Sequence, residues 1–296
     1  MDRISYIEDI AAREKRLDDH GLVYALVRCL SPDDAATLLL RLVEVPTTSV
    51  RTAAIRKVCS DIISGKLADP TTVITTLMTR ITECEPRRRE SVAYCLLEIA
   101  RVCEATLQRK AQALLGASRY VGLRRRSYKL YVADSGESQV LLEQAWRQHR
   151  DHEAAWLIVK TFPIPFLLAE KNVLLNSLTE GWQLSRLYLR LAEAVPETLG
   201  ELLALDPISY IYVAAKRGIP LPIEVVDQVL DLSLGDERLG LLLWSIGELG
   251  LWDVLLNVTN RLGFIENAQR ARILKQLPSD LSVADLPVMG TRWPHG

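Results

Sequence analysis

Two short runs of arginine are the residues of this chain whose type and spacing best fit a chemical role. A guanidinium group binds phosphate or carboxylate through paired hydrogen bonds, and it also stacks on aromatic rings. Tyr120, Tyr128 and Tyr131 are interleaved with the second run. The pattern therefore predicts a surface that binds phosphate or an acidic peptide, and its members are Arg87, Arg88, Arg89, Arg124, Arg125, Arg126, Tyr128 and Lys129.

The charge of the chain is distributed unevenly around these arginines. The net charge of −1 argues against nucleic-acid binding through the overall charge. Residues 86–130, however, contain 11 basic and 3 acidic residues, whereas residues 131–250 contain 9 basic and 17 acidic residues. Three interpretations of the basic segment stay open. It is a partner-binding surface, a solvated helix face on which arginine stems cover apolar surface, or a surface that faces the acidic segment.

No residue pattern in the chain predicts catalysis. A GxSxG motif, a glycine-rich phosphate loop, an HExxH motif and the Rossmann fingerprint are all missing from the sequence. The only His-Glu dyad is His152-Glu153, and one dyad does not supply the ligands of a two-metal site. The five cysteines form no CxxC pair, so we expect free thiols. The sequence favours a protein that uses no cofactor and is not an enzyme.

The composition indicates a folded, water-soluble chain. Of its 296 residues, 49% are hydrophobic and 25% are charged, as in ordinary globular proteins. Residues 1–16 contain charges where a secretory signal needs an apolar core. The longest apolar run, residues 239–251, contains Glu248 and is shorter than the roughly 20 residues of a membrane span. We therefore expect a cytoplasmic protein that does not contact a membrane.

The elements that must position the arginines are predicted as amphipathic helices. Residues 49–64 place apolar side chains at steps of three or four, and the small residue Ala54 marks a point where a second helix can approach. Residues 86–103 repeat the pattern with Ala93 in that place, 39 residues later, and Ser127 follows after another 34. The polar face of the first helix is predicted to carry Arg51, Arg56, Lys57 and Ser60.

Further helices are predicted from start signals and from the breakers between them. Ser31 and Asp69 each precede a proline, which is typical of a cap followed by the first helical turn. Beyond Gly136 the helical segments shorten, and no stretch shows the alternation of a strand. The predicted helices there are residues 138–148, 153–161, 182–194, 208–216, 223–233, 236–249 and 268–277.

A period of 30–40 residues filled by two antiparallel helices predicts an all-α fold, an α-solenoid of roughly seven to eight helical hairpins. The segment VRTAAIRKV, residues 50–58, resembles the second helix of a HEAT-like repeat. We expect one solenoid over residues 1–290, with longer, more regular repeats in 1–132 and shorter, degenerate ones in 133–290. Residues 291–296 are expected to fray.

The resemblance to HEAT-like repeats implies a non-catalytic scaffold or adaptor that holds a protein partner on a concave surface lined by the second helices. The alternative is a nucleic-acid-binding protein that uses the arginine-rich segment. HEAT-like alkylpurine DNA glycosylases line their groove with tryptophans and an acidic residue, and the nearest such set here is Trp146, Trp156 and Asp151. We expect these tryptophans to be packing residues, and the core anchors to include Trp182, Trp244 and Trp252.

Overall fold

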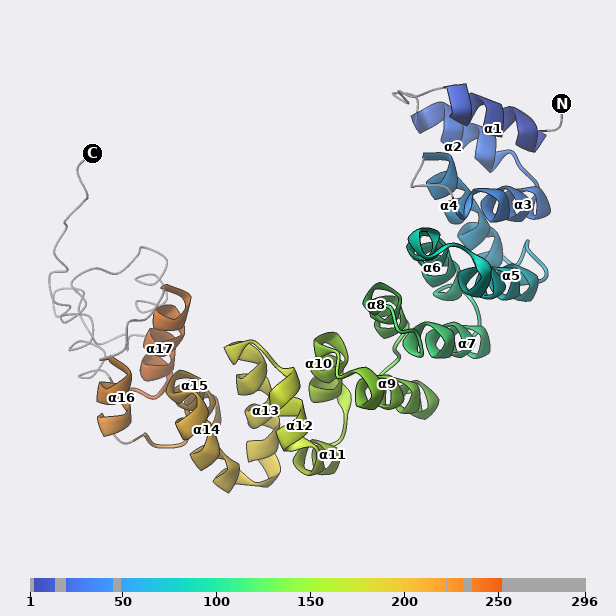
Figure 1. The fold of residues 1–296 in the computed structure, drawn as a ribbon. Coiled ribbons are helices and arrows are strands. Elements are labelled where there is room, and N and C mark those ends of the chain that lie inside the picture. The colour runs from blue at the N-terminus through green and yellow to red at the C-terminus, as the bar shows by residue number, and fades with distance from the viewer. Residues whose placement is uncertain (1–2, 14–19, 45–48, 222, 231–235, 252–296) are drawn as a thin grey trace, which may run out of the picture. The chain divides into compact units, whose positions relative to one another are not determined.

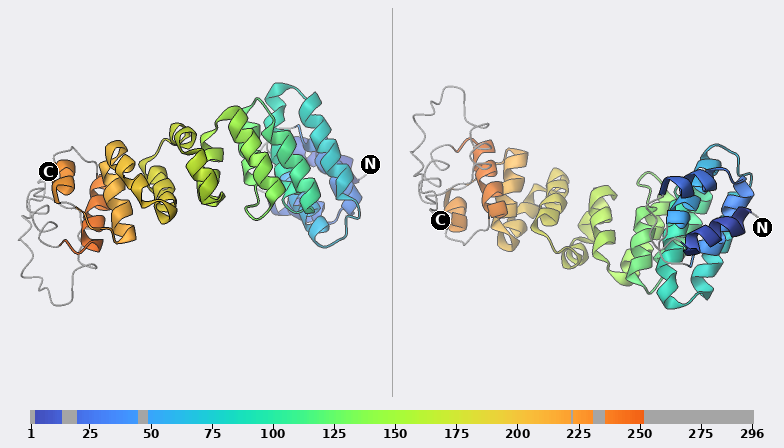
Figure 2. Two further views of the ribbon diagram at one scale, coloured as in Figure 1. Left: turned by 90° about the horizontal axis from the view of Figure 1, so that it is seen from below. Right: turned by 90° about the horizontal axis from the view of Figure 1, so that it is seen from above.

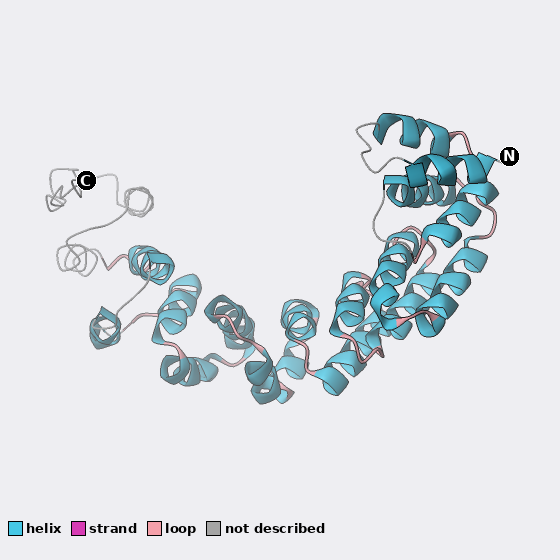
Figure 3. Cartoon of the chain, turned by 45° about the horizontal axis from the view of Figure 1, so that its top comes forward, coloured by secondary structure: helices cyan, strands magenta, loops and turns pink. Residues whose placement is uncertain are grey.

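The protein is described here by a computed structural model, which covers residues 3–13, 20–44, 49–221, 223–230 and 236–251. Every regular element in these residues is a helix (Figure 3), which confirms the predicted all-α class. Among these helices, none combines the length and the apolar character needed to cross a membrane. The chain divides into two compact units, residues 1–161 and 162–296. Each unit is considered separately.

The bounds of the described helices are as follows. In the first unit they are α1 Arg3–Arg13, α2 His20–Arg28, α3 Pro32–Leu42, α4 Ser49–Ile63, α5 Pro70–Glu83, η1 Pro86–Arg88 (a 3₁₀ turn), α6 Arg89–Ala100, α7 Ala105–Gly116, α8 Val121–Lys129, α9 Gly136–His149 and α10 His152–Thr161. In the second unit they are α11 Ile164–Ala169, α12 Lys171–Ser177, α13 Gly181–Ala194, η2 Pro196–Thr198 (a 3₁₀ turn), α14 Leu199–Leu205, α15 Pro207–Arg217, α16 Ile223–Leu230 and α17 Asp236–Glu248.

The helices of the first unit pack as successive pairs. Helix α3 contacts α4, α5 contacts α6, α7 contacts α8, and α9 contacts α10. Each helix also contacts its counterpart in the next pair, so that α3, α5, α7 and α9 form one row and α4, α6, α8 and α10 form another. Figures 1 and 2 show these helices side by side. We call the second set the second-helix row.

The predicted start signals form helix caps. The Oγ of Ser31 accepts a hydrogen bond from the backbone N–H of Asp34 at 3.1 Å, and a carboxylate oxygen of Asp69 accepts one from the N–H of Thr71 at 2.9 Å. Each proline that follows lies in the first helical turn, where a missing N–H costs nothing. Local chemistry is therefore enough to start α3 and α5.

Small residues in the second-helix row lie where its helices pack most tightly. Ala54, Ala93 and Ser127 are all buried, in the helices α4, α6 and α8 that contact one another in sequence. At Gly116 of α7, an added Cβ would lie 3.1 Å from the Oγ of Ser127. Helix α7 therefore approaches α8 more closely than a larger residue at position 116 allows.

The structure corrects the predicted position of Arg51, which was placed on the polar face of its helix. The residue is only 2% exposed. Its guanidinium donates to the Oγ of Ser91 in α6, and Ser91 donates to the carbonyl oxygen of Val43 at 2.7 Å. The guanidinium also lies 5.8 Å from the ring centroid of Tyr94. Arg51 thus joins two neighbouring helix pairs instead of facing solvent.

The second unit is organised around α15, which contacts α13, α14, α16 and α17. Asp206 caps α15 by accepting from the N–H groups of Ile208 and Ser209, and Arg238 of α17 donates to the same carboxylate at 2.5 Å. The prediction of Trp182 as a core anchor is wrong, because the residue is 53% exposed. The predictions for Trp252, for the helix 268–277 and for the tail 291–296 lie outside the described residues.

The five cysteines are free thiols of unequal exposure: Cys29 is exposed, Cys59 is half-buried, and Cys84, Cys95 and Cys103 are buried. Burial and the charge of Glu98 raise the pKa of Cys59 to about 12, and burial raises the pKa of Cys95 to about 11. Because the thiolate is the nucleophile, we expect iodoacetamide at pH 8 to modify Cys29 well before the other four cysteines. Timed labelling followed by peptide mass spectrometry checks this. Equal rates in the native protein would contradict it, whereas urea-unfolded protein should lose the difference.

Candidate binding surface at the arginine-rich helix starts

The two arginine runs come from neighbouring helices of the second-helix row. Arg87 and Arg88 lie in η1, and Arg89 is the first residue of α6. The second run begins at Arg124, one turn inside α8. If α6 and α8 are aligned so that Ala93 matches Ser127, the first run lies nearer the start of its helix than the second run does. This offset gives the two runs different surroundings.

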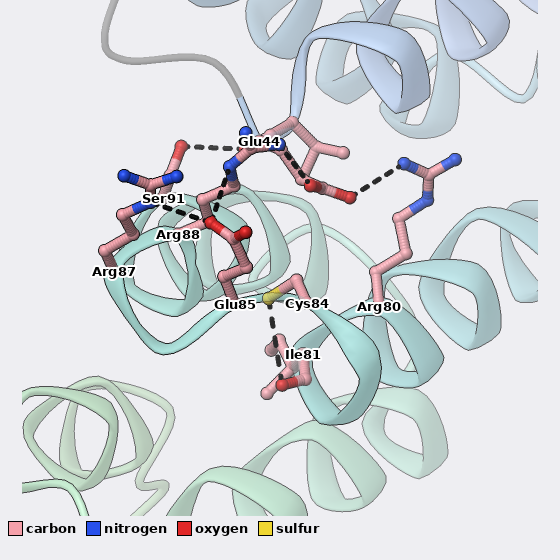
Figure 4. Close-up of polar contacts among 9 residues, drawn as sticks. Glu44, Arg80, Ile81, Cys84, Glu85, Arg87, Arg88 and Ser91 are labelled. Carbon is pink, nitrogen blue, oxygen red and sulfur yellow. Dashed lines mark hydrogen bonds and ion pairs between the residues drawn. The ribbon is translucent and has the colours of Figure 1, made fainter.

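Arg87 and Arg88 of the first run lie in an exposed cluster of ion pairs (Figure 4). Glu44 accepts from Arg80 at 3.2 Å and from Arg88 at 3.1 Å. Glu85 accepts from the Nε of Arg87 at 2.7 Å, and this hydrogen bond, together with the charge of Arg87, lowers the pKa of Glu85. The side chain of Arg87 is nonetheless 77% exposed. Exposed pairs of this kind are screened by solvent and contribute little to stability, so these arginines are available to a competing anion.

Arg124 of the second run is buried in a polar network between two helix pairs. Its Nε and Nη2 donate to the two carboxylate oxygens of Asp151 at 2.5 and 2.7 Å, and its Nη1 donates to the carbonyl oxygen of Ser118 at 3.0 Å. The hydroxyl of Tyr128 donates to Asp151 at 2.5 Å. The side chains of Arg124 and Asp151 are each 9% exposed. The network joins α8 to the link between α9 and α10.

The protonation states of this network follow from its contacts. Burial by itself would raise the pKa of Asp151, but hydrogen bonds from Arg124 and Tyr128 outweigh burial and lower it. Burial and the neighbouring Asp151 raise the pKa of Tyr128. Asp151 is therefore ionised and Tyr128 neutral at physiological pH, which is the arrangement that the bidentate pair with Arg124 requires.

Arg125 and Arg126 bind carboxylates of flanking segments. Arg125 donates to Glu153 of α10 at 2.6 Å, and its side chain is 58% exposed. Arg126 donates to the carbonyl oxygen of Gly122 at 2.6 Å and lies 3.6 Å from a carboxylate oxygen of Glu90. Part of the basic segment therefore pairs with the start of the acidic segment, as one of the open interpretations describes.

Two arginines surround Tyr120, the residue before α8. The guanidinium of Arg89 lies 5.2 Å from the ring centroid and that of Arg119 lies 4.9 Å from it. Arg119 also donates to the Tyr120 hydroxyl at 2.7 Å. The hydrogen bond and charge of Arg119, followed by those of Arg89, lower the pKa of Tyr120. Sequence reasoning missed Arg119 because it lies outside both runs, although its position beside Tyr120 is visible in the sequence.

The predicted binding set therefore separates into accessible and inaccessible members. Arg124 and Tyr128 are buried and engaged with Asp151, so they present no donors to solvent. Arg87, Arg88, Arg125 and Lys129 are exposed, and Arg89 and Arg126 are half-buried. Sequence reasoning also did not anticipate the carboxylates that separate the arginines, because Glu44 and Glu153 come from helix pairs other than those of their partners.

The residues that resemble a glycosylase site are not open to a groove. Trp146 is fully buried, with the guanidinium of Arg150 at 4.6 Å from its ring, and Asp151 is occupied by the network described above. Within the described residues, no three histidine, cysteine or acidic side chains gather closely enough to hold a metal ion.

Comparisons of the chain with models of protein families, with curated proteins and with solved structures find no match.

Proposed function

We propose that this protein is a HEAT-like α-solenoid of roughly seven to eight hairpins that acts as a non-catalytic scaffold in the cytoplasm. The solenoid is supported by the successive helix pairs of the first unit, in which each helix also contacts its counterpart in the next pair. This is the nearest-neighbour packing of repeat proteins. Buried Arg51 and Arg124 occupy equivalent positions in α4 and α8, and each binds the helix pair that follows.

The partner that we propose is a protein with an acidic segment, held along the second-helix row on the concave surface of the solenoid. The observation that carries this proposal is the alternation of exposed arginines with carboxylates from Arg87 to Glu153. A protein partner presents acidic and basic groups that match such a pattern, and electrostatic complementarity of this kind sets specificity. A nucleic acid presents negative charge and no basic groups to pair with Glu44, Glu85 and Glu153, so it matches this pattern less well.

A triple charge reversal tests this proposal. In the variant Arg87→Glu, Arg88→Glu, Arg125→Glu, we expect affinity for a purified partner, identified with the wild-type chain, to fall by at least about tenfold. The matched control is Arg56→Glu, Arg101→Glu, Arg147→Glu, which changes the net charge equally at other exposed arginines of the first unit. Calorimetry measures both affinities, and circular dichroism checks that both variants stay helical.

The same proteins distinguish the nucleic-acid alternative. Fluorescence anisotropy with labelled single- and double-stranded DNA and RNA is recorded across a range of salt concentrations. We expect no saturable binding at physiological salt. Tight binding that weakens steeply with salt and disappears in the triple reversal would replace the scaffold with a nucleic-acid-binding protein. Partner affinity that is the same in the triple reversal and the control would remove the arginines from the site.

A further inference from the structure

One part of the arginine-rich surface contains two arginines without an ion pair in the described residues. Among the described residues, neither Arg89 nor Arg119 forms an ion pair with an acidic side chain, and both lie within about 5 Å of the Tyr120 ring centroid. Four other arginines of this surface each lie beside a glutamate: Arg87, Arg88, Arg125 and Arg126. Two positive charges are thus concentrated around one phenol without a counterion.

We propose that Arg89, Arg119 and Tyr120 form a binding site for a phosphate monoester carried by a protein partner, such as a phosphoserine side chain. This inference rests on the proposed scaffold function and specifies the group that the partner presents. The site lies where the link from α7 reaches the start of α8, opposite the first residue of α6. It draws one arginine from each of two neighbouring helix pairs.

The charge and donors of the site match a phosphate monoester better than a carboxylate. A phosphomonoester carries a charge of about −1.5 to −2 at pH 7 and has three acceptor oxygens, whereas a carboxylate would neutralise only one of the two guanidinium groups. Guanidinium groups donate to phosphate in parallel pairs. The Tyr120 hydroxyl, which already accepts from Arg119 at 2.7 Å, adds a further donor at the same place.

The neighbourhood of the site favours a compact anion over an extended nucleic acid. Glu90 follows Arg89 directly, is exposed and lies 3.6 Å from Arg126. An added Cβ at Gly122 would lie 2.4 Å from the Glu90 Oε1, so the absence of a side chain there leaves room for this carboxylate at the start of α8. A chain of phosphodiesters that spans both α6 and α8 would meet Glu90 beside Arg126 as well as the two arginines.

The hydroxyl of Tyr120 provides a direct signal of occupancy. The two arginines lower its pKa, with Arg119 contributing most. A bound dianion takes the donors of Arg119 and adds negative charge beside the phenol, so it raises the pKa of Tyr120. The ionisation of this tyrosine, obtained as the ultraviolet absorbance difference between the wild type and Tyr120→Phe, should therefore move to higher pH when the site is filled.

The test uses the full-length chain and a short glycine-flanked phosphoserine peptide, with serine and glutamate versions as comparisons. Calorimetry should show the phosphopeptide binding at least about tenfold more tightly than either comparison peptide. Arg119→Gln should weaken this binding by about tenfold, and Tyr120→Phe by about threefold. The matched control is Arg56→Gln, because Arg56 is also exposed and lies 5.1 Å from a tyrosine ring centroid, that of Tyr24, outside the proposed site. This variant should leave binding unchanged.

Several outcomes overturn the inference. These are equal binding of the three peptides, equal losses in Arg119→Gln and Arg56→Gln, an unmoved Tyr120 titration, or tighter binding of a 5′-phosphorylated oligoribonucleotide. Phosphatase treatment of the purified partner separates this inference from the scaffold proposal. If the dephosphorylated partner binds as before and still requires Arg87, Arg88 and Arg125, the scaffold stands and the phosphate site is wrong. If only the phosphopeptide binds and no partner depends on those three arginines, the phosphate site stands and the acidic-segment proposal is wrong.

Discussion

Replacement of Asp151 by asparagine is expected to lower the free energy of unfolding by about 3 kcal/mol. Asp151 is the only acidic residue that contacts Arg124 in the described part of the chain, and both side chains are 9% exposed. Asparagine keeps an acceptor for the Tyr128 hydroxyl but leaves the guanidinium charge buried without a counterion. Urea unfolding of the full chain, followed by circular dichroism, measures the loss.

The neighbouring pair Arg125–Glu153 is a matched control for this prediction. It has a similar distance, 2.6 Å, but the side chains are 58% and 38% exposed. Solvent screens such a pair, so Glu153→Gln should cost at most about 1 kcal/mol. The double variant Arg124→Met, Asp151→Asn should lose less stability than Asp151→Asn alone, since no buried charge remains. Equal losses for Asp151→Asn and Glu153→Gln would show that the network is not buried as described.

The pH dependence of this effect has a definite sign. The pKa of Asp151 is lower in the folded protein than its ordinary value, so its contribution to stability is complete above the ordinary aspartate range. It is lost as the pH falls through that range, about 3.9, toward the lower pKa of the folded state. The difference in stability between wild type and Asp151→Asn should therefore be present at neutral pH and shrink as the pH falls through the aspartate range.

The variants Ala54→Asp and Ala93→Asp should each lose at least about 4 kcal/mol of stability. Both alanines are fully buried in helices α4 and α6, which contact each other and the next helices of the same row. An aspartate in either position places an unpaired carboxylate where no water reaches and where the extra volume does not fit. Thermal and urea unfolding measure the effect.

Ala25→Asp separates this packing effect from the poor helix propensity of aspartate. Ala25 is exposed within α2, so this substitution should cost only about 0.7 kcal/mol. If Ala54→Asp and Ala93→Asp unfold at the same urea concentration as Ala25→Asp, the inward face of the second-helix row is assigned wrongly.

The helix starts and the inward faces of the long helices could be predicted from the sequence alone, because local chemistry sets them. Ser31 and Asp69 cap α3 and α5 as predicted, because a cap needs only its own side chain and the N–H groups two or three residues on. The apolar period of 49–64 and 86–103 likewise placed Ala54 and Ala93 in the core, since the period of a helix brings those positions to one face whatever the neighbours are.

Short elements were harder to predict for a physical reason. The short helices α11, α12 and α14 were not among the predicted helices. The 12-residue helix α7, residues 105–116, was also not predicted, and its length does not explain the omission. Pro163 is the residue before α11, and Pro165 lies in its first turn. A proline ends one helix and starts the next equally well, and a helix of six or seven residues is too short to reveal a period.

Only the tertiary structure decided which arginines are buried and which are available. Arg51 and Arg124 have the sequence surroundings of solvated arginines, but each meets a partner from the following helix pair, Ser91 in one case and Asp151 in the other. The partner makes burial of the charge tolerable, and it lies 27 to 40 residues away along the chain. The carboxylates beside Arg88 and Arg125 have the same origin. The residue pattern of one helix contains no information about the charged side chains that the next helix pair places beside it.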